Sequence, residues 1–430
     1  MNVKQLREQI EAGGFDAKLT PLYALDGSAA SLSRAKERCA RLADGFLVRF
    51  GNAEDAAFIS GPGRTEIAGN HTDHQHGHVL CGSVDMDMLS CAAPNGSKVV
   101  RILSEGYPEL SISLDELDAK AEEKGTSAAL VRGVAAGMAE LGYALSGFDA
   151  CVHSTVLSGS GLSSSAAYEI LIGNIFNRFS CGDGLDAVAL AKIGQYAENV
   201  YFGKPCGLMD QMASSVGSAV AIDFEEPARP VVERVDFDFS RCGHALCIID
   251  TASSHDDLTE EYAAIPREMC AVAAHFGKTV LREVPEEAFR GAIPALRQKL
   301  GDRAVLRAMH FYADDRRAAQ EAEALRGGDF PRFLSLVGAS GLSSELLLQN
   351  IWCASHPERQ AVTLSLALGR ELLRGAGAIR VHGGGFAGTI QAFVPDREVE
   401  RFKAGMEAVL GEGKCHILHI RPAGGCVVCG

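Results

Sequence analysis

Residues 61–80 read GPGRTEIAGNHTDHQHGHVL and lie between two hydrophobic segments. The side chains in this stretch that can bind a ligand or a metal are Arg64, Glu66, Asn70, His71, Asp73, His74, His76 and His78. Such a loop is typical of a metal site, a solvated surface turn or the wall of a pocket for a polar ligand. The sequence on either side decides among the three.

The composition is that of a globular protein, with 47% hydrophobic and 22% charged residues. Because 430 residues exceed the usual size of one compact core, two domains are expected. The net charge of −14 argues against a broad surface for nucleic acid or an anionic membrane. No stretch has the pattern of a signal peptide or a membrane span. We therefore expect small-molecule partners, no nucleic acid, no membrane, and a monomer or weak oligomer.

The 13 cysteines are mostly scattered singly through apolar runs, which favours free thiols in a reducing cytoplasm. Cys426 and Cys429 form one close pair, in GGCVVCG, but no second pair follows at zinc spacing. A final strand is the better interpretation of that segment. A cytoplasmic location is expected.

Hydrophobic periodicity and turn signals divide the chain into helices and strands without a regular alternation of the two. The predicted strands cover 78–93, 98–106, 148–157, 219–224, 245–251, 378–384, 389–395 and 415–422. The predicted helices cover 30–50, 115–142, 162–178, 184–200, 208–216 and much of 258–375. This pattern predicts an α+β fold rather than a doubly wound sheet. The charged run DFEEPARPVVERVDFD is the expected crossing between domains 1–225 and 226–430.

A second loop, LSGSGLSSSAAYEI at 157–170, follows a predicted strand and opens a predicted helix. Backbone N–H groups and the positive end of the helix dipole would meet at one point, which suits phosphate. The loop is not a Walker loop, because no Gly-Lys-Ser/Thr closes it. An ordinary helix start rich in capping residues remains the alternative.

Two further segments contain candidate binding groups. VHGGGFAGTIQAFV at 381–394 contains a G-x-G-x-x-G pattern, but a strand-like segment follows it, so a tight turn between strands is favoured over a dinucleotide site. AENVYFGKPCGLMDQMASSVG at 197–217 carries Glu198 and Asp210 on either side of a glycine- and proline-containing bend. The two acids could converge on one point or be ordinary surface charges.

Taken in order, these segments resemble the GHMP kinase superfamily, and within it the galactokinases. GPGRTEIAGNHTDHQHG is similar to the galactokinase signature, SGSGLSSSA to the phosphate loop, PCGLMDQ to the catalytic-aspartate segment, and HGGGFAG to the third glycine motif. The resemblance implies two α+β domains, an N-terminal one like the second domain of ribosomal protein S5 and a C-terminal α/β domain. The active site would lie in the cleft between them.

The resemblance also implies a role for each matching residue. Asp210 and Arg64 would be catalytic, and MgATP and a small sugar would be the bound molecules. The residues expected to bind the sugar are Asn70, His71, Asp73, Gly207 and Tyr262. Those expected to cradle the ATP phosphates are Gly159, Ser160, Gly161, Leu162, Ser163, Ser164 and Ser165. Ser164 or Ser165 would hold Mg²⁺ together with Glu198, and Gly383, Gly384 and Gly385 form the third glycine motif.

Moving a γ-phosphoryl group from ATP to a sugar hydroxyl is mainly a problem of positioning and charge. Backbone amides, a helix dipole and Mg²⁺ offset the polyphosphate charge, and a carboxylate can orient the hydroxyl and take its proton. Asp210 must stay ionised for that role, which a nearby guanidinium favours. The implied reaction is galactose to galactose 1-phosphate.

The opening stretch is therefore best interpreted as a sugar pocket, and its histidines lack the spacing of a metal site. His76 and His78 are expected as solvated loop residues. Two departures from the galactokinase signature concern the sugar, because Asn70 replaces a glutamate and His74 a tyrosine. A 1-kinase for a related sugar such as galacturonate or N-acetylgalactosamine, or a catalytically weak sugar sensor, remains an alternative.

Overall fold

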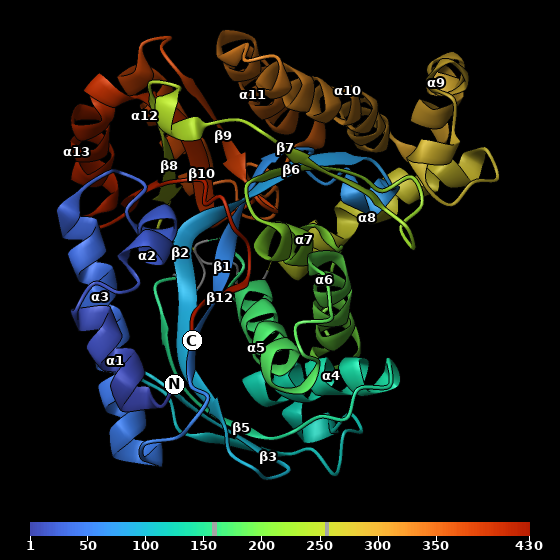
Figure 1. The fold of residues 1–430 in the computed structure, drawn as a ribbon. Coiled ribbons are helices and arrows are strands. Elements are labelled where there is room, and N and C mark those ends of the chain that lie inside the picture. Colours follow the sequence, from blue (N-terminus) through green and yellow to red (C-terminus); the bar gives the residue numbers. More distant parts are fainter. Residues whose placement is uncertain (157–160, 254–257) are drawn as a thin grey trace.

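The computed structural model describes residues 1–156, 161–253 and 258–430, which fold around two sheets (Figure 1). The strands are β1 (Ala57–Ala68), β2 (His78–Pro94), β3 (Val99–Ser104), β4 (Leu110–Ser113), β5 (Phe148–Ser154), β6 (Ala219–Asp223), β7 (Val231–Val235), β8 (His244–Asp250), β9 (Ala378–His382), β10 (Thr389–Pro395), β11 (Cys415–Leu418) and β12 (Cys426–Cys429). The helices are α1 (Val3–Glu11), α2 (Asp16–Tyr23), α3 (Ala29–Phe50), α4 (Ser127–Glu140), α5 (Ser164–Ser180), α6 (Ala187–Tyr196), α7 (Met209–Val216), α8 (Thr259–His275), α9 (Glu286–Leu300), α10 (Asp302–Arg326), α11 (Phe330–Ser343), α12 (Ala361–Leu373) and α13 (Val399–Leu410).

The first sheet is built on the long strand β2. Its strand order is β12-β1-β2-β5-β3-β4, and β6 with β7 extends from the other half of β2. Residues 88–94 of β2 pair with β5, and residues 78–82 pair with β6. The second sheet has the order β11-β8-β10-β9 and is antiparallel. The strands pair mostly antiparallel, and helices do not alternate regularly with them along the chain. Both features confirm the α+β class.

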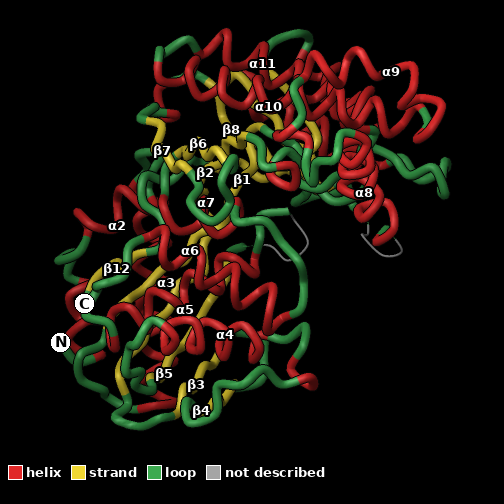
Figure 2. The backbone as a smooth tube through the Cα atoms, turned by 90° about the vertical axis from the view of Figure 1, so that its right-hand side faces the viewer, coloured by secondary structure: helices red, strands yellow, loops and turns green. Residues whose placement is uncertain are grey.

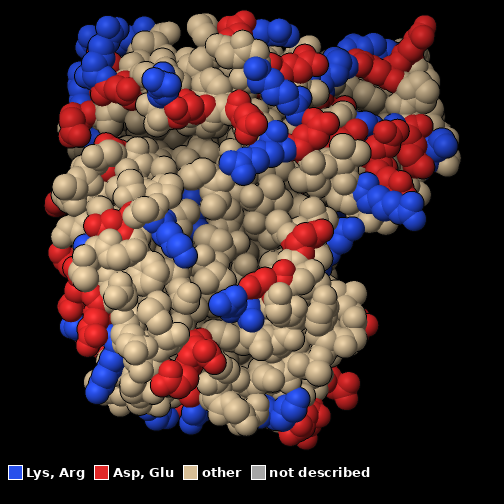
Figure 3. All heavy atoms as spheres, in the orientation of Figure 1, with Lys and Arg blue, Asp and Glu red and all other residues tan. Residues whose placement is uncertain are grey.

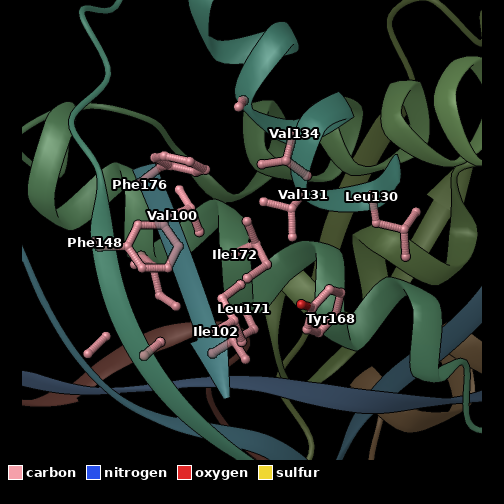
Figure 4. Packing of buried hydrophobic residues seen from close by; sticks show 14 of the residues in the cluster. Val100, Ile102, Leu130, Val131, Val134, Phe148, Tyr168, Leu171, Ile172 and Phe176 are labelled. Atoms are coloured by element: carbon pink, nitrogen blue, oxygen red, sulfur yellow. The ribbon is translucent and has the colours of Figure 1, made fainter. Parts of the chain in front are cut away.

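Helices α1–α3 lie on one side of the first sheet and α4–α7 on the other (Figures 1 and 2). On the α4–α7 side, the Phe148 ring of β5 meets the Phe176 ring of α5 edge-on, with centroids 5.1 Å apart (Figure 4). In the second sheet, alternation along β8 separates two cores. Leu246 and Ile248 face the cluster that includes α11 residues, whereas Cys247 and Ile249 face α12 and α13.

One apolar cluster joins the two sheets. It contains Ile67 and Leu80 of the first sheet together with Ile248 and Phe393 of the second. By sheet membership, β7 and β12 belong with the first sheet although both lie beyond residue 225. The charged run expected as a domain crossing thus contributes β7, and the tail returns to pair with β1.

Most predicted elements are confirmed, and two are corrected. The helix expected over 115–142 is limited to α4, because Thr126 caps it after Gly125, whose φ is 78°. The opening stretch, expected as a loop, begins within β1, all of whose residues are buried. Its glycines and proline hid the strand, and the pairing of β1 with β2 shifts register between Pro62 and Arg64.

All 13 cysteines are free thiols, and Cys426–Cys429 is a strand as expected. Within the described parts of the chain, no helix is both long enough and apolar enough to cross a bilayer.

Gly61 allows helix α5 to lie directly against β1. A Cβ atom at position 61 would lie 2.2 Å from the Ala167 carbonyl oxygen and 2.7 Å from the Leu171 nitrogen, both backbone atoms.

We predict that Gly61→Ala lowers the free energy of unfolding by about 3 kcal/mol or more. Urea denaturation measures this loss. Gly291→Ala is the control, because that helical glycine has open space around it and should gain up to about 1 kcal/mol. Equal effects of the two substitutions would contradict the prediction.

Candidate active site

Arg64 and Asp210 form the central ion pair of the site. Arg64 lies within strand β1, and Asp210 lies in the first turn of α7. Arg64 Nε is 2.6 Å from Asp210 Oδ1 and Arg64 Nη2 is 2.7 Å from Oδ2, so both carboxylate oxygens accept a hydrogen bond. The Arg64 side chain is 9% exposed and that of Asp210 is 22% exposed. The carboxylate therefore reaches solvent while its guanidinium partner is enclosed.

The environment keeps Asp210 ionised. Burial raises its pKa, but the charge and hydrogen bonds of Arg64, with a hydrogen bond from Ser163, outweigh burial and leave the pKa below its ordinary value. Asp210 is thus a carboxylate at neutral pH and a weak base.

The described part of the second loop lies against the same arginine. Arg64 donates to the carbonyl oxygen of Gly161 through Nη1 and to that of Leu162 through its backbone N–H. Gly161 has a φ of 71°, and a Cβ there would lie 2.7 Å from Thr389 Oγ1. Gly159 and Ser160 lie outside the described residues. The described part of the loop is therefore fixed between β1 and β10.

The N-terminus of α5 follows at once. Ser163 is its N-cap residue in a left-handed conformation and makes no side-chain capping bond, and Ser164 begins the helix. The first N–H groups of this 17-residue helix are consequently not used by a capping side chain.

Glu198 lies beside this helix start, on a π-helical turn, Ala197–Phe202. Its Oε1 accepts hydrogen bonds from Ser165 Oγ at 2.9 Å and from Lys204 Nζ at 3.1 Å. Its Oε2 accepts one from Gln211 at 2.8 Å. The described residues contain no group of three or more histidine, cysteine or acidic side chains placed to hold a metal. A hydroxyl and one carboxylate are the oxygen ligands that Mg²⁺ takes when phosphate completes its coordination.

Asp73 and Gly207 are brought together from distant parts of the chain. A Cβ atom at Gly207 would lie 2.4 Å from Asp73 Oδ2. The glycine is thus required for the carboxylate to occupy this position, which explains why these two predicted residues share one site.

The third glycine motif forms a turn between β9 and β10, as expected, and its carbonyl oxygens anchor the predicted sugar residues. Asn70 donates to the Gly383 carbonyl at 2.7 Å, and Tyr262 donates to that of Gly385 at 2.7 Å. His71 Nε2 lies 3.0 Å from the Gly384 carbonyl, so Nε2 carries the proton and Nδ1 remains an acceptor.

Asn70 does not fit its predicted role. Its amide nitrogen donates to Glu66 and Gly383, and its oxygen accepts from Ser344 at 3.1 Å and Asn350 at 2.8 Å. The residue is fully buried. Both donors and both acceptor positions are therefore used within the protein, and no group is left for a sugar.

Comparison with known proteins agrees with this geometry. Residues 128–218 match the model of the GHMP kinases N terminal domain, and residues 44–94 match the galactokinase galactose-binding signature. These two segments of the chain are therefore similar to the GHMP kinases, and within them to the galactokinases.

Relatives of this protein include a galactokinase from Streptomyces coelicolor, 29% identical over 360 residues, which are 83% of this chain and 89% of that protein. The fold matches Lactococcus lactis galactokinase, whose structure contains galactose, with a TM-score of 0.75 and 24% identity over 89% of this chain and 98% of that one. Methanococcus jannaschii mevalonate kinase matches with a TM-score of 0.61 and 12% identity, over 85% and 99% of the two chains.

Three residues of this site were missed at the level of sequence. Lys204 stands only six residues after Glu198, and that proximity was an available signal. Glu66 was noted as a polar group without a role. Asn350 carries no motif and joins the site only through tertiary packing. His78, expected as a solvated residue, instead pairs with Asp315 at 2.9 Å and Asp223 at 3.2 Å.

His71 should stay neutral at physiological pH. Burial, and then the neighbouring His74, lower the pKa of His71 from 6.5 to about 4. Because the folded value lies below the unfolded one, stability from neutral His71 is full above about pH 6.5 and declines towards pH 4. We predict an NMR titration midpoint for His71 near pH 4, with His71→Gln assigning the signal. His419, whose pKa Asp85 raises, should shift in the opposite direction in the same spectra. A His71 midpoint above 6 would contradict the prediction.

Proposed function

We propose that this protein is a GHMP-type kinase that transfers the γ-phosphoryl group of ATP to the anomeric hydroxyl of galactose, giving galactose 1-phosphate. The observation that carries the proposal is the Arg64–Asp210 pair beside the start of α5. It sets an ionised carboxylate and a fixed cation next to the helix end that suits phosphate. The galactokinase relatives agree with galactose as the acceptor.

The nucleotide phosphates would lie at the N-terminus of α5. The Ser163–Ser165 segment offers backbone N–H groups that no capping side chain occupies. Arg64 ties the preceding turn to β1 through two carbonyl oxygens, those of Gly161 and Leu162. The donors are thereby fixed before phosphate binds, which is the arrangement that stabilises developing charge without reorganisation.

Ser165 and Glu198 would hold the Mg²⁺ ion. The two side chains come from different elements and lie 2.9 Å apart, so they present a hydroxyl and a carboxylate oxygen to one point. Bound there, the ion would neutralise charge on the transferring phosphoryl oxygens.

Asp210 acts mainly by orientation and charge. Arg64 donates to both of its oxygens and Ser163 donates to one of them, which leaves one acceptor position for the sugar hydroxyl. Because Arg64 lowers its pKa, Asp210 is a poor acceptor of a proton in the ground state. It becomes a useful one only as the hydroxyl acidifies during bond formation to phosphorus.

The charges around the pocket favour a neutral sugar over a uronate. Asp73, Glu66 and Asp210 supply carboxylates, whereas the two buried guanidiniums are already paired, Arg64 with Asp210 and Arg380 with Glu66. A substrate carboxylate would find no unpaired guanidinium among these groups. Since Arg64, Glu198 and Asp210 keep a working geometry, an enzyme is favoured over a pure sensor. Free thiols throughout agree with a cytoplasmic location.

A substrate panel tests the function directly. We predict ADP release from MgATP with galactose, and at least about 100-fold lower kcat/KM with galacturonate or glucuronate, because unmatched charge in a polar pocket is costly. Glucose and N-acetylgalactosamine complete the panel. Turnover confined to a uronate would refute the choice of sugar. Wild-type enzyme that releases no ADP with any sugar would refute the kinase.

Asp210→Asn tests the acceptor carboxylate. We expect kcat to fall by about 10²–10⁴-fold, because the amide can orient the hydroxyl but carries no charge and takes no proton. Asp223→Asn is the matched control, since Asp223 also pairs with an arginine, Arg282, and is 23% exposed against 22% for Asp210. The control should keep kcat. Circular dichroism verifies the fold of both, and near-normal turnover of Asp210→Asn would refute its role.

A further inference from the structure

The galactokinase signature carries a glutamate where this chain has Asn70, so another side chain would have to take the place of that glutamate. Asn70 itself cannot, because its amide is saturated within the protein. Glu66 lies four residues before Asn70, in strand β1, and its Oε1 is 3.0 Å from the Asn70 amide nitrogen. A carboxylate therefore remains at this corner of the site, but it comes from β1 rather than from the following turn.

Glu66 shares a face of β1 with Arg64. The pairing of β1 with β2 is regular from Arg64 to Glu66, with register shifts only outside that interval. Residues two apart on a strand point to the same side, roughly 7 Å apart along it. The Thr65 side chain, between them, contacts His382 and Gln391 of the second sheet. Glu66 thus lies on the same side as the Arg64–Asp210 pair, displaced by about the width of a sugar ring.

Only one oxygen of Glu66 is used by the protein. Oε1 accepts from Arg380 Nη2 at 2.7 Å and from Asn70, whereas the described residues provide no hydrogen bond to Oε2. Nor is Oε2 among the fully enclosed oxygens without a partner, a set that includes both carboxylate oxygens of Glu321. The Glu66 side chain is 4% exposed. One carboxylate oxygen is consequently held still, and the other is left with a narrow opening.

Nearby charges agree with this placement. Burial raises the pKa of Glu66, Arg380 and then Arg64 lower it, Asp73 raises it, and the net result is a pKa of about 6. Glu66 is thus within electrostatic reach of both the catalytic arginine and the predicted sugar carboxylate Asp73.

We propose that Glu66 is a specificity-determining residue of the sugar pocket, where its Oε2 accepts a hydrogen bond from a hydroxyl remote from C1, at C4 or C6. Arg380 and Asn70 are positioning residues that fix its other oxygen. This proposal rests on the proposed function. An acceptor carboxylate selects for a hydroxyl and against a substrate carboxylate, so the same residue accounts for the preference for a neutral sugar.

The test compares Glu66→Gln with wild type on galactose, 4-deoxygalactose and 6-deoxygalactose. Wild type should discriminate against the analogue that lacks the contacted hydroxyl by about 100-fold or more in kcat/KM. In Glu66→Gln that ratio should shrink at least about ten-fold for one analogue and stay unchanged for the other. Glu321→Gln is the control, because Glu321 also interacts with Arg380 but has both carboxylate oxygens enclosed, and its ratios should not change.

A counter-ion role alone predicts a different result. If Glu66 only neutralises Arg380, Glu66→Gln lowers kcat/KM for all three sugars by one factor and leaves both ratios unchanged, which overturns the proposal. Should Glu66→Gln fail to fold because Arg380 is left unpaired, Glu66→Asp decides. It keeps the charge and withdraws the oxygen by one methylene, so one ratio should still shrink. Unchanged ratios in an active enzyme remove only the role of Glu66, whereas inactivity of wild type towards every sugar removes the proposed function.

Discussion

The site depends on how closely helix α5 approaches strand β1. Position 61 has no side chain, and a Cβ there would lie 2.2 Å from the Ala167 carbonyl oxygen of α5. This contact fixes the start of α5 against the strand, three residues before Arg64. Arg64 can then reach the loop that precedes the helix and, at the same time, Asp210 on α7. One backbone constraint therefore places the start of α5, where we propose that phosphate binds, beside a cation and a carboxylate.

The other half of the site is held by the second sheet. Buried hydrogen bonds join Thr65 to His382 and Glu66 to Arg380, and Asn70 donates to the carbonyl oxygen of Gly383, just after β9. An apolar cluster joins the two sheets behind them. Separating the halves would leave several buried polar groups unpaired, at about 1–3 kcal/mol each. These contacts therefore hold the residues of the proposed sugar pocket in place. Figure 3 shows the surface hollowed between the lobe that carries α8–α10 and the lobe that carries α4–α6.

The sequence was informative where function or alternation imposes a pattern. Alternating hydrophobic runs identified β2, β5 and β8, and ordered motifs identified Arg64, Glu198 and Asp210 as neighbours. It was uninformative where a residue's meaning depends on distant partners. Asn70 looks like a sugar ligand until Ser344 and Asn350 are seen to saturate it. The sequence also failed to predict strand β1, for a related reason. Gly61 and Pro62 are typical of a loop, but here the glycine is needed because α5 packs directly against the strand.

The three charge pairs of the site differ in how easily they can exchange partners. Arg64 and Arg380 have side chains 9% and 0% exposed, so their pairing with Asp210 and Glu66 is fixed by burial. Lys204 is different, because its side chain is 62% exposed while its partner Glu198 is 2% exposed. The Lys204 ammonium itself can return to solvent, but its departure leaves the buried Glu198 carboxylate in need of another cation. We therefore expect the proposed Mg²⁺ ion to replace the Lys204 ammonium beside Glu198, whereas the Arg64–Asp210 and Arg380–Glu66 pairs stay intact.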